Sequence, residues 1–328
     1  MRRRDFITLL GGAAAAWPLA ARAQQPDRMR RIGVLMGTTP TKQYETYLAA
    51  FLRRLDELGW KKGRDARIEV RWWTGGPQQM RPVVAELLAF SPNVIMVYSN
   101  LALAVLKPMA EKVPVVFVGI GDPVGDGFVR SFSRPGGNIT GFAGYDGPMG
   151  GKWLEVLKET VPHLSRALAV FHPETPIHRA FLRSIEDSAP HLGIEVTPAG
   201  VHDATEIESA ISSFAMHENG GIIVLPHVIT WANENLFIAM ELRHRLPAIF
   251  ASPGSVTAGG LVSYGNDFEE SFRNAAEYVD RILRGENPGD LPVQQPTKYM
   301  LTFNLKTAKA IGIDVPPTLL ARADEVIE

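Results

Sequence analysis

The sequence predicts an α/β protein of two lobes, each a doubly wound parallel sheet. Three observations predict this class. A length of 328 residues favours two domains over one. Short apolar runs alternate with segments whose apolar residues recur at helical spacing. A glycine-rich stretch over 135–151 separates two sets of such segments of similar size.

Residues 1–23 are expected to be a signal peptide rather than part of the fold. Three arginines at positions 2–4 precede an apolar run over 9–16, and Ala21-Arg22-Ala23 is a small-x-small cleavage site. The arginines and Phe6 fit a twin-arginine signal, although the general secretory route stays open. The apolar run is shorter than the roughly 20 residues that span a membrane, which disfavours a short anchor. We therefore expect cleavage after Ala23 and a periplasmic protein.

The first set alternates four strands with three helices. The apolar run over 31–36 is typical of a buried strand, and Gly59 is a plausible end for the helix that follows it. Pro108 interrupts the third helix. The expected strands are 31–36, 66–73, 93–98 and 113–118, and the expected helices are 44–58, 80–90 and 101–112.

The second set repeats this architecture without a sequence repeat. Its strands end in short polar or proline-containing turns, and its last helix carries a continuous apolar face. The expected helices are 153–161, 177–191, 205–217, 232–246 and 268–283, and the expected strands are 167–171, 194–198, 221–225 and 248–250.

Composition excludes several classes of function. The chain carries 34 basic and 35 acidic residues, so no overall positive field attracts nucleic acid. Removal of residues 1–23 takes away a net charge of +3, and the formal charge changes from −1 to −4. The absence of cysteine excludes disulfides, thiolate chemistry and anchoring through a lipidated cysteine.

Several motifs resemble the family of ABC-transporter substrate-binding proteins associated with tryptophan and tyrosine uptake. The resemblance runs from about residue 31 to the C-terminus. Its segments are Asp-Pro-Val at 122–124, Arg-Pro-Gly-Gly-Asn-Ile-Thr-Gly at 134–141, Gly-Lys-Trp-Leu at 151–154, Gly-Gly-Leu-Val-Ser-Tyr-Gly at 259–265, Asp-Leu-Pro-Val-Gln-Gln-Pro-Thr-Lys at 290–298 and Arg-Ala-Asp-Glu-Val-Ile-Glu at 322–328.

This resemblance implies a type I periplasmic-binding fold, with two lobes joined by a three-crossing hinge. The first lobe would comprise residues 30–145 and 264–290, and the second 146–263 and 291–328. The resemblance also implies capture of a small amino-acid-like solute, possible aromatic specificity, and delivery to an ABC permease and its ATPase in the inner membrane. It implies no catalysis and no cofactor.

Polar residues after the first and third strands are candidate ligand contacts. Thr38 and Thr39 follow the first strand, and Ser99 and Asn100 follow the third. Because the carboxyl ends of parallel strands share one edge, these side chains could meet a solute carboxylate near a helix N-terminus. The alternative is plain helix capping, which Thr41 could supply alone in the first case.

Gly121 and Asp122 follow the fourth strand. A carboxylate in a closed cleft needs a cation or several donors, so Asp122 could bind the solute's ammonium group. The alternative is that Asp122 organises its own Asp-Pro turn. Gly119 and Gly121 weakly resemble a dinucleotide fingerprint, but Pro123 opposes the helix that this fingerprint requires.

The second lobe and the hinge supply the remaining candidates. Thr175, His227 and Ser252 stand at strand ends, Tyr145 lies near the first crossing and Tyr264 at the second. Either tyrosine could stack on an aromatic solute or pack between the lobes.

No catalytic or metal signature accompanies these residues. The eight histidines form no His-Glu-x-x-His motif, and no Gly-x-Ser-x-Gly elbow is present. We expect a monomer with no metal and no cofactor. A sensor that signals to a membrane receptor, or an exported enzyme on the same fold, remains the alternative.

Overall fold

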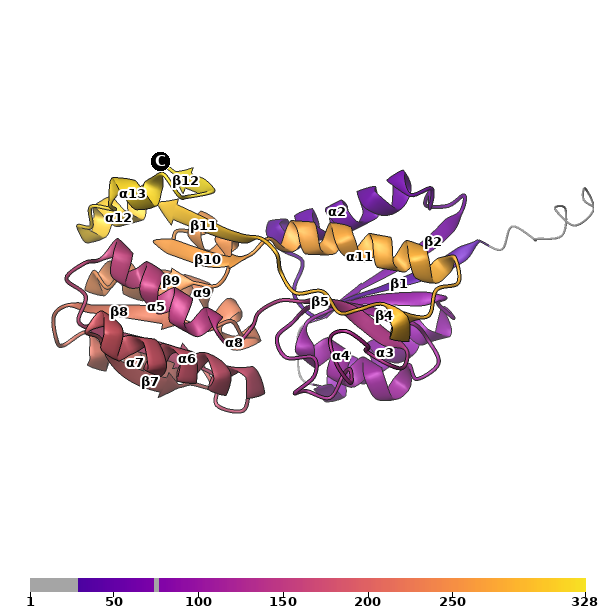
Figure 1. Ribbon diagram of the computed structural model, residues 1–328, viewed down its shortest axis with the longest axis horizontal. Coiled ribbons are helices and arrows are strands. Elements are labelled where there is room, and N and C mark those ends of the chain that lie inside the picture. The colour runs from indigo at the N-terminus through magenta and orange to yellow at the C-terminus, as the bar shows by residue number, and fades with distance from the viewer. Residues whose placement is uncertain (1–28, 74–76) are drawn as a thin grey trace, which may run out of the picture.

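The computed structural model describes residues 29–73 and 77–328, and the predicted signal peptide lies outside them. The described chain forms two α/β lobes side by side (Figure 1). This confirms the predicted fold class.

The first sheet has five parallel strands in the order β2-β1-β3-β4-β5. The four predicted strands are present, and β5 adds a fifth from within the glycine-rich stretch. Helices α2 and α11 pack together over one face, and α3 and α4 lie together over the other (Figure 1). The bounds are β1 Arg30–Met36, β2 Ala66–Trp72, β3 Val94–Tyr98, β4 Val115–Ile120, β5 Ile139–Ala143, α2 Lys42–Glu57, α3 Pro77–Ala89, α4 Asn100–Leu106 and α11 Phe268–Leu283.

The second sheet has seven strands in the order β12-β11-β10-β9-β8-β6-β7. Its strands are parallel except where β11 runs antiparallel to β10, so this sheet is mixed rather than wholly parallel. The strand bounds are β6 Arg166–Phe171, β7 Glu195–Gly200, β8 Gly220–Val224, β9 Ala248–Phe250, β10 Val262–Asn266, β11 Tyr299–Asn304 and β12 Glu325–Ile327. The helices are α5 Met149–Thr160, α6 Pro176–Leu192, α7 Ala204–Phe214, α8 Val228–Ala232, α9 Glu234–His244, α10 Pro253–Thr257, α12 Leu305–Ile311 and α13 Pro317–Leu320.

Two predicted helices are divided in the structure. The helix expected over 101–112 ends at Leu106, and a 3-10 turn follows over Lys107–Met109, because Pro108 cannot continue the α-helical ladder. The prediction of one helix over 232–246 was wrong, because the helical segment starts earlier and is interrupted. Helix α8 begins at Val228, and Asn233 leaves helical geometry between α8 and α9.

The chain crosses between the lobes after β5, after β10 and before β11 (Figure 1). These crossings shift the expected lobe boundaries by a few residues. Strand β10 pairs with β9 and β11, so residues 264–266 belong to the second sheet. Residues 291–294 stay with the first lobe, where Thr140 Oγ1 donates to the Leu291 carbonyl at 2.6 Å and Ala143 N donates to the Gln294 carbonyl at 2.8 Å.

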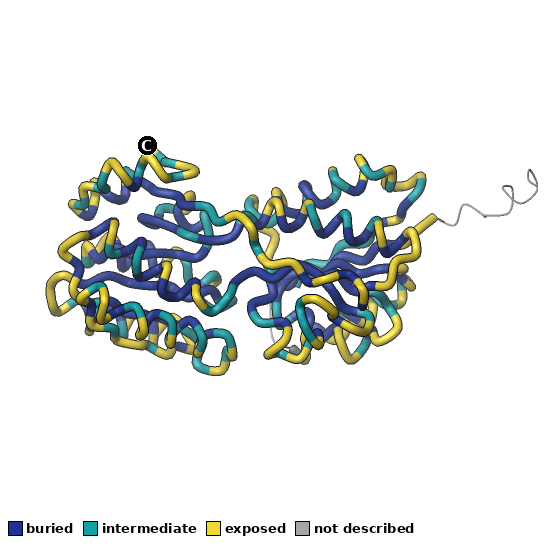
Figure 2. The backbone as a smooth tube through the Cα atoms, viewed as in Figure 1, coloured by how far each residue is buried: buried dark blue, intermediate teal, exposed yellow. Residues whose placement is uncertain are grey.

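Buried side chains form a continuous core through the hinge. The central strands of both sheets are buried, the edge strands β7 and β12 are partly or fully exposed, and the outer helices alternate between buried and exposed positions (Figure 2). At the hinge, Tyr98 and Tyr145 both contact Phe268 edge-on, with ring centroids 6.1 and 5.8 Å apart. Tyr145 continues to Trp153, whose Nε1 donates to the Tyr264 carbonyl at 2.6 Å. This packing fixes how the strand ends of one lobe face those of the other.

Glu241 is a buried carboxyl within the second lobe. Its two oxygens accept the backbone N–H groups of Ala248 at 2.8 Å and Leu261 at 3.2 Å. Burial raises the pKa of Glu241 well above its usual value, against the lowering effect of these two bonds. The side chain joins the start of β9 to the loop before β10.

Candidate functional site

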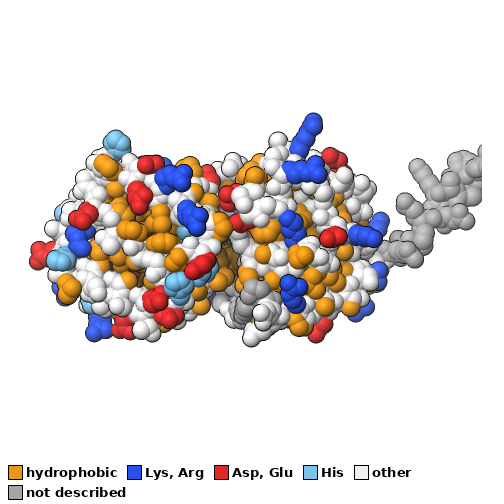
Figure 3. All heavy atoms as spheres, turned by 90° about the horizontal axis from the view of Figure 1, so that it is seen from below, with side chains coloured by type: hydrophobic (Ala, Val, Ile, Leu, Met, Phe, Trp, Pro, Cys, Tyr) orange, Lys and Arg blue, Asp and Glu red, His pale blue; other side chains and the backbone are white. Residues whose placement is uncertain are grey.

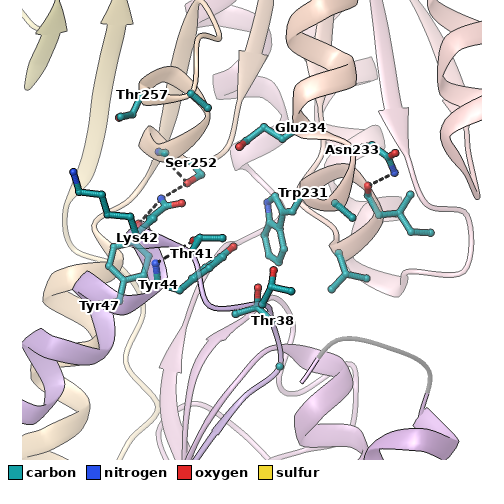
Figure 4. Close-up of a pocket in the computed structure, with 18 of the residues that line it drawn as sticks. Thr38, Thr41, Lys42, Tyr44, Tyr47, Trp231, Asn233, Glu234, Ser252 and Thr257 are labelled. Carbon is teal, nitrogen blue, oxygen red and sulfur yellow. Dashed lines mark hydrogen bonds between the residues drawn. The ribbon is translucent and has the colours of Figure 1, made fainter. Parts of the chain in front are cut away.

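A cavity of about 1000 Å³ lies between the lobes. The first lobe contributes the loop after β1 and the start of α2. The second contributes α8, the start of α9 and α10 (Figure 4). Because the lining comes from both lobes at their strand ends, the cavity has the position at which two-lobed α/β proteins bind ligands.

Two aromatic side chains from opposite lobes face each other across this cavity. Trp231 projects from α8 toward Thr38 of the first lobe, and the Tyr44 ring extends toward Trp231 (Figure 4). Burial raises the pKa of Tyr44 to about 12, so its hydroxyl is protonated at neutral pH. The pair provides a large apolar surface with one polar end on each ring.

Polar groups lie at the edges of this aromatic surface. Glu234, the first residue of α9, lines the cavity, and its Oε1 accepts a hydrogen bond from the Ser255 hydroxyl. On the other lobe, Thr41 caps α2 by accepting the Tyr44 backbone N–H at 3.4 Å. Thr38 and Thr39 are then free of the capping role and line the cavity beside the N-terminus of this 16-residue helix.

A hydrogen-bonded bridge joins the lobes at one wall of the cavity. Gln43 Nε2, from α2, donates to Ser252 Oγ at 2.9 Å and to the Tyr47 hydroxyl at 2.8 Å. The Gln43 amide lies directly against Gly254, where a Cβ would be 2.1 Å from Oε1. Only glycine at position 254 permits this contact.

Three of the eleven residues singled out from the sequence line the cavity: Thr38, Thr39 and Ser252. Ser252 also caps α10, where its Oγ accepts the Gly254 N–H at 3.3 Å.

The candidates after β3 and β4 lie outside the lining and are satisfied locally. Ser99 caps α4 by accepting the Ala102 N–H at 3.3 Å. Asn100 accepts the Gly121 N–H at 3.2 Å and donates to Asp126. Asp122 accepts the Gly125 N–H at 2.8 Å, which is the bond expected of the alternative turn role. Gly121 instead touches the second lobe, since a Cβ there would lie 3.2 Å from Ile177.

The remaining four candidates also lie outside the lining. Tyr145 is buried at the hinge, and its hydroxyl donates to the Ala251 carbonyl at 3.3 Å. Tyr264 stacks on Tyr299 with centroids 5.6 Å apart. Thr175 precedes α6 with its Oγ1 3.4 Å from His172 Nδ1, and His227 caps α8.

Sequence reasoning missed Tyr44, Trp231 and Glu234. The start of α8 carries no usual sequence signal, because His227 and Thr230 are not the Ser/Thr/Asp/Asn and Glu/Gln pair that marks a capping box. A helix beginning at Val228 would have brought Trp231 within one turn of the sheet edge.

Neither a metal site nor a spanning helix is found among residues 29–73 and 77–328. No group of three or more His, Asp or Glu side chains there is arranged to hold a metal ion. No helix in that part of the chain has the length and apolarity to cross a membrane.

The fold and the cavity define a two-lobed protein of the periplasmic-binding type. The chain belongs to the family of ABC transporter substrate binding proteins, whose model matches residues 44–327. It is 24% identical over 271 residues to the tyrosine-binding protein of Clostridioides difficile strain R20291, which covers 80% of this chain and 75% of that protein.

Solved structures share the fold at low sequence identity. A domain from Streptococcus pneumonia in complex with L-Trp has a TM-score of 0.82 and 20% identity, covering 91% of this chain and all of that one. A conserved domain protein from Vibrio cholerae O1 biovar eltor has a TM-score of 0.82 and 23% identity over the same shares. The family and fold that the sequence motifs imply are therefore confirmed.

Proposed function

We propose that this protein is the solute-binding component of an ABC importer and holds an aromatic amino acid between its lobes. The observation that carries this proposal is the cavity in which Trp231 and Tyr44, from opposite lobes, face each other between polar groups. A tyrosine-binding relative and a similar fold solved with L-Trp support an aromatic ligand. Such a ligand gains contacts from both lobes only when they are closed, so it stabilises the closed form.

The polar groups suggest an orientation for the ligand. Its ring packs against Trp231, and its ammonium group meets the Glu234 carboxylate at the start of α9. Its carboxylate meets Thr38 and Thr39 beside the N-terminus of α2, whose dipole favours a negative charge. This orientation assigns the ammonium group to Glu234 in place of Asp122.

The same proposal includes location and partners. The mature protein, exported and cleaved after Ala23, acts in the periplasm as a monomer and passes its solute to a permease and ATPase of the inner membrane. It performs no catalysis and takes no cofactor, metal or nucleic acid. A sensor for a membrane receptor would use the same closure, and loss of uptake on deletion of the gene distinguishes transport from sensing.

The binding test uses isothermal titration of residues 24–328 with L-tryptophan, L-tyrosine, L-phenylalanine, L-leucine and N-acetyl-L-tryptophan. We expect the aromatic amino acids to bind more tightly than L-leucine, and N-acetyl-L-tryptophan to bind poorly because it lacks the ammonium group. Glu234→Gln should weaken L-tryptophan binding by about 10- to 150-fold, which is the loss of one charged hydrogen bond of ~1.5–3 kcal/mol.

Glu218→Gln is the matched control, since Glu218 is exposed and lies outside the cavity lining. The proposed ligand class would be refuted by the absence of binding for every aromatic amino acid. Equal affinities for the wild type and Glu234→Gln would refute the proposed orientation.

A further inference from the structure

Four of the eight histidines gather at one edge of the second lobe. His172 and His227 stack with ring centroids 4.2 Å apart and an interplanar angle of 18°. The His202 ring is 5.5 Å from His172, and the His178 ring is 5.9 Å from His227. Histidine and acidic side chains are seen together on the second lobe beside its junction with the first (Figure 3).

The acidic side chains of this cluster contact two of the four rings, His172 and His202. Glu174 lies 3.3 Å from His172 Nδ1 and 3.2 Å from His202 Nε2, and Glu206 lies 3.0 Å from His202 Nδ1. The contacts with Glu206 and Glu174 raise the pKa of His202, so a positive charge is accommodated on this ring. Among the described residues, no carboxylate lies within 4.0 Å of His227.

His227 connects this cluster to the wall of the cavity. Its Nδ1 accepts the Ile229 N–H at 3.2 Å, and its own backbone N–H donates to Thr230 Oγ1 at 3.0 Å. These two bonds form a complete capping box at the start of α8, the five-residue helix that carries Trp231. Because Nδ1 accepts a hydrogen bond, the neutral ring carries its proton on Nε2.

Protonation of His227 necessarily breaks this cap. The added proton can enter only at Nδ1, which then points an N–H at the Ile229 N–H. The imidazolium would also face His172 and His178, and Glu174 is the only compensating charge that acts on it within the described part of the chain. Burial, and then repulsion from His172 and His178, lower the pKa of His227 to about 3.

We propose that His227 is a positioning residue that holds Trp231 in the cavity wall only while its ring is neutral, so that mild acid displaces α8 and weakens ligand binding. The proposal rests on the proposed function for its ligand alone, since the displacement of α8 is observable without one. Asp203, the N-cap of α7, accepts the backbone N–H of Glu206. Glu206, on α7, contacts the backbone N–H and the ring of His202 rather than His227.

The size of the effect follows from the two states of His227. When α8 is displaced, the pKa of His227 returns to its ordinary value of 6.5, whereas the pKa is about 3 while α8 is in place. Proton binding then favours the displaced state by up to about 30-fold at pH 5.0 and by almost nothing at pH 7.5.

The experiment measures the intrinsic tryptophan fluorescence of ligand-free protein between pH 7.5 and 5.0. L-tryptophan titrations accompany it at both ends of that range. His227→Asn is the test variant, because asparagine also caps a helix but does not titrate. His217→Asn makes the same change at an exposed histidine outside the cluster.

We expect a reversible fluorescence change in the wild type and in His217→Asn, with far-UV circular dichroism unchanged, and no change in His227→Asn or Trp231→Phe. The L-tryptophan affinity should fall by up to about 30-fold at pH 5.0 in the wild type and by less than about threefold in His227→Asn. A wild-type protein that shows no fluorescence change would overturn the proposal, as would a change that persists in His227→Asn or in Trp231→Phe. Absence of binding for every aromatic amino acid at pH 7.5 would refute the proposed function instead, and the fluorescence would still decide on the role of His227.

Discussion

Substitution of Gly254 by alanine tests whether the Gln43 bridge holds the lobes closed. Position 254 lies in α10, where alanine is favoured over glycine, so the helix itself gains from the change. The new Cβ would lie 2.1 Å from Gln43 Oε1 and 2.3 Å from its Cδ, so the Gln43 side chain must leave. Its departure breaks the bonds from Nε2 to Ser252 and to the Tyr47 hydroxyl.

Each of these hydrogen bonds contributes about 1 kcal/mol net, so the closed form loses about 1–2 kcal/mol. We therefore expect the affinity for the ligand to fall by about 5- to 30-fold in Gly254→Ala, with no fall in the urea midpoint of either lobe. Isothermal titration measures the first quantity, and small-angle scattering of the ligand-free protein should show a larger radius of gyration.

A double-mutant cycle provides the control. In a Gln43→Ala background the clash is absent, so adding Gly254→Ala should change the affinity by less than about twofold. If Gly254→Ala lowers the ligand affinity equally in the wild-type and Gln43→Ala backgrounds, the loss of affinity comes from α10 itself and the bridge has no part in closure.

Three further substitutions test the stability of the separate lobes. Glu241→Gln should lower the free energy of unfolding by about 1–3 kcal/mol at pH 5 and by less at pH 8, measured by urea denaturation. The raised pKa of Glu241 gives stability that is present below its usual value of 4.5 and is lost as pH rises, so a gap that widened with pH would contradict this reasoning. Gly141→Ala should cost about 3 kcal/mol or more, because φ is +154° and a Cβ would lie 2.1 Å from the Phe117 carbonyl oxygen. Gly285→Ala, where φ is +108° but nothing lies within 4 Å, should cost only about 1 kcal/mol, and equal losses at both glycines would refute a role for the clash.

Most of the central strands could be predicted from sequence because they are buried on both faces. An uninterrupted apolar run such as Ile95–Tyr98, followed by turn residues, is typical of a fully buried strand. Strand β5 was missed because its five residues include Gly141, which the pattern of the surrounding glycines assigns to a loop. Strands β11 and β12 complete the second sheet from the C-terminal tail, and their pairing depends on a long-range antiparallel contact that local pattern does not encode.

The candidate site could be predicted only in part. The rule that ligands bind at the carboxyl ends of parallel strands predicted the edge of each sheet at which the cavity lies. It does not tell which of the loops at that edge keep their polar groups free. Asn100 and Asp122 stand at this edge, yet each is used by its own turn or by a neighbouring loop.

Hydrogen bonding within each loop therefore decides which strand-end residues can serve a ligand. Thr41 takes the capping role at α2 and leaves Thr38 and Thr39 on the cavity, whereas at α4 the cap is Ser99 itself. The second determinant is the hinge, where Tyr145 packs against Trp153 and Phe268 and donates to the Ala251 carbonyl, which joins the lobes that carry Trp231 and Tyr44. A cavity shared between two lobes is thus a property of their junction as well as of the loops that line it.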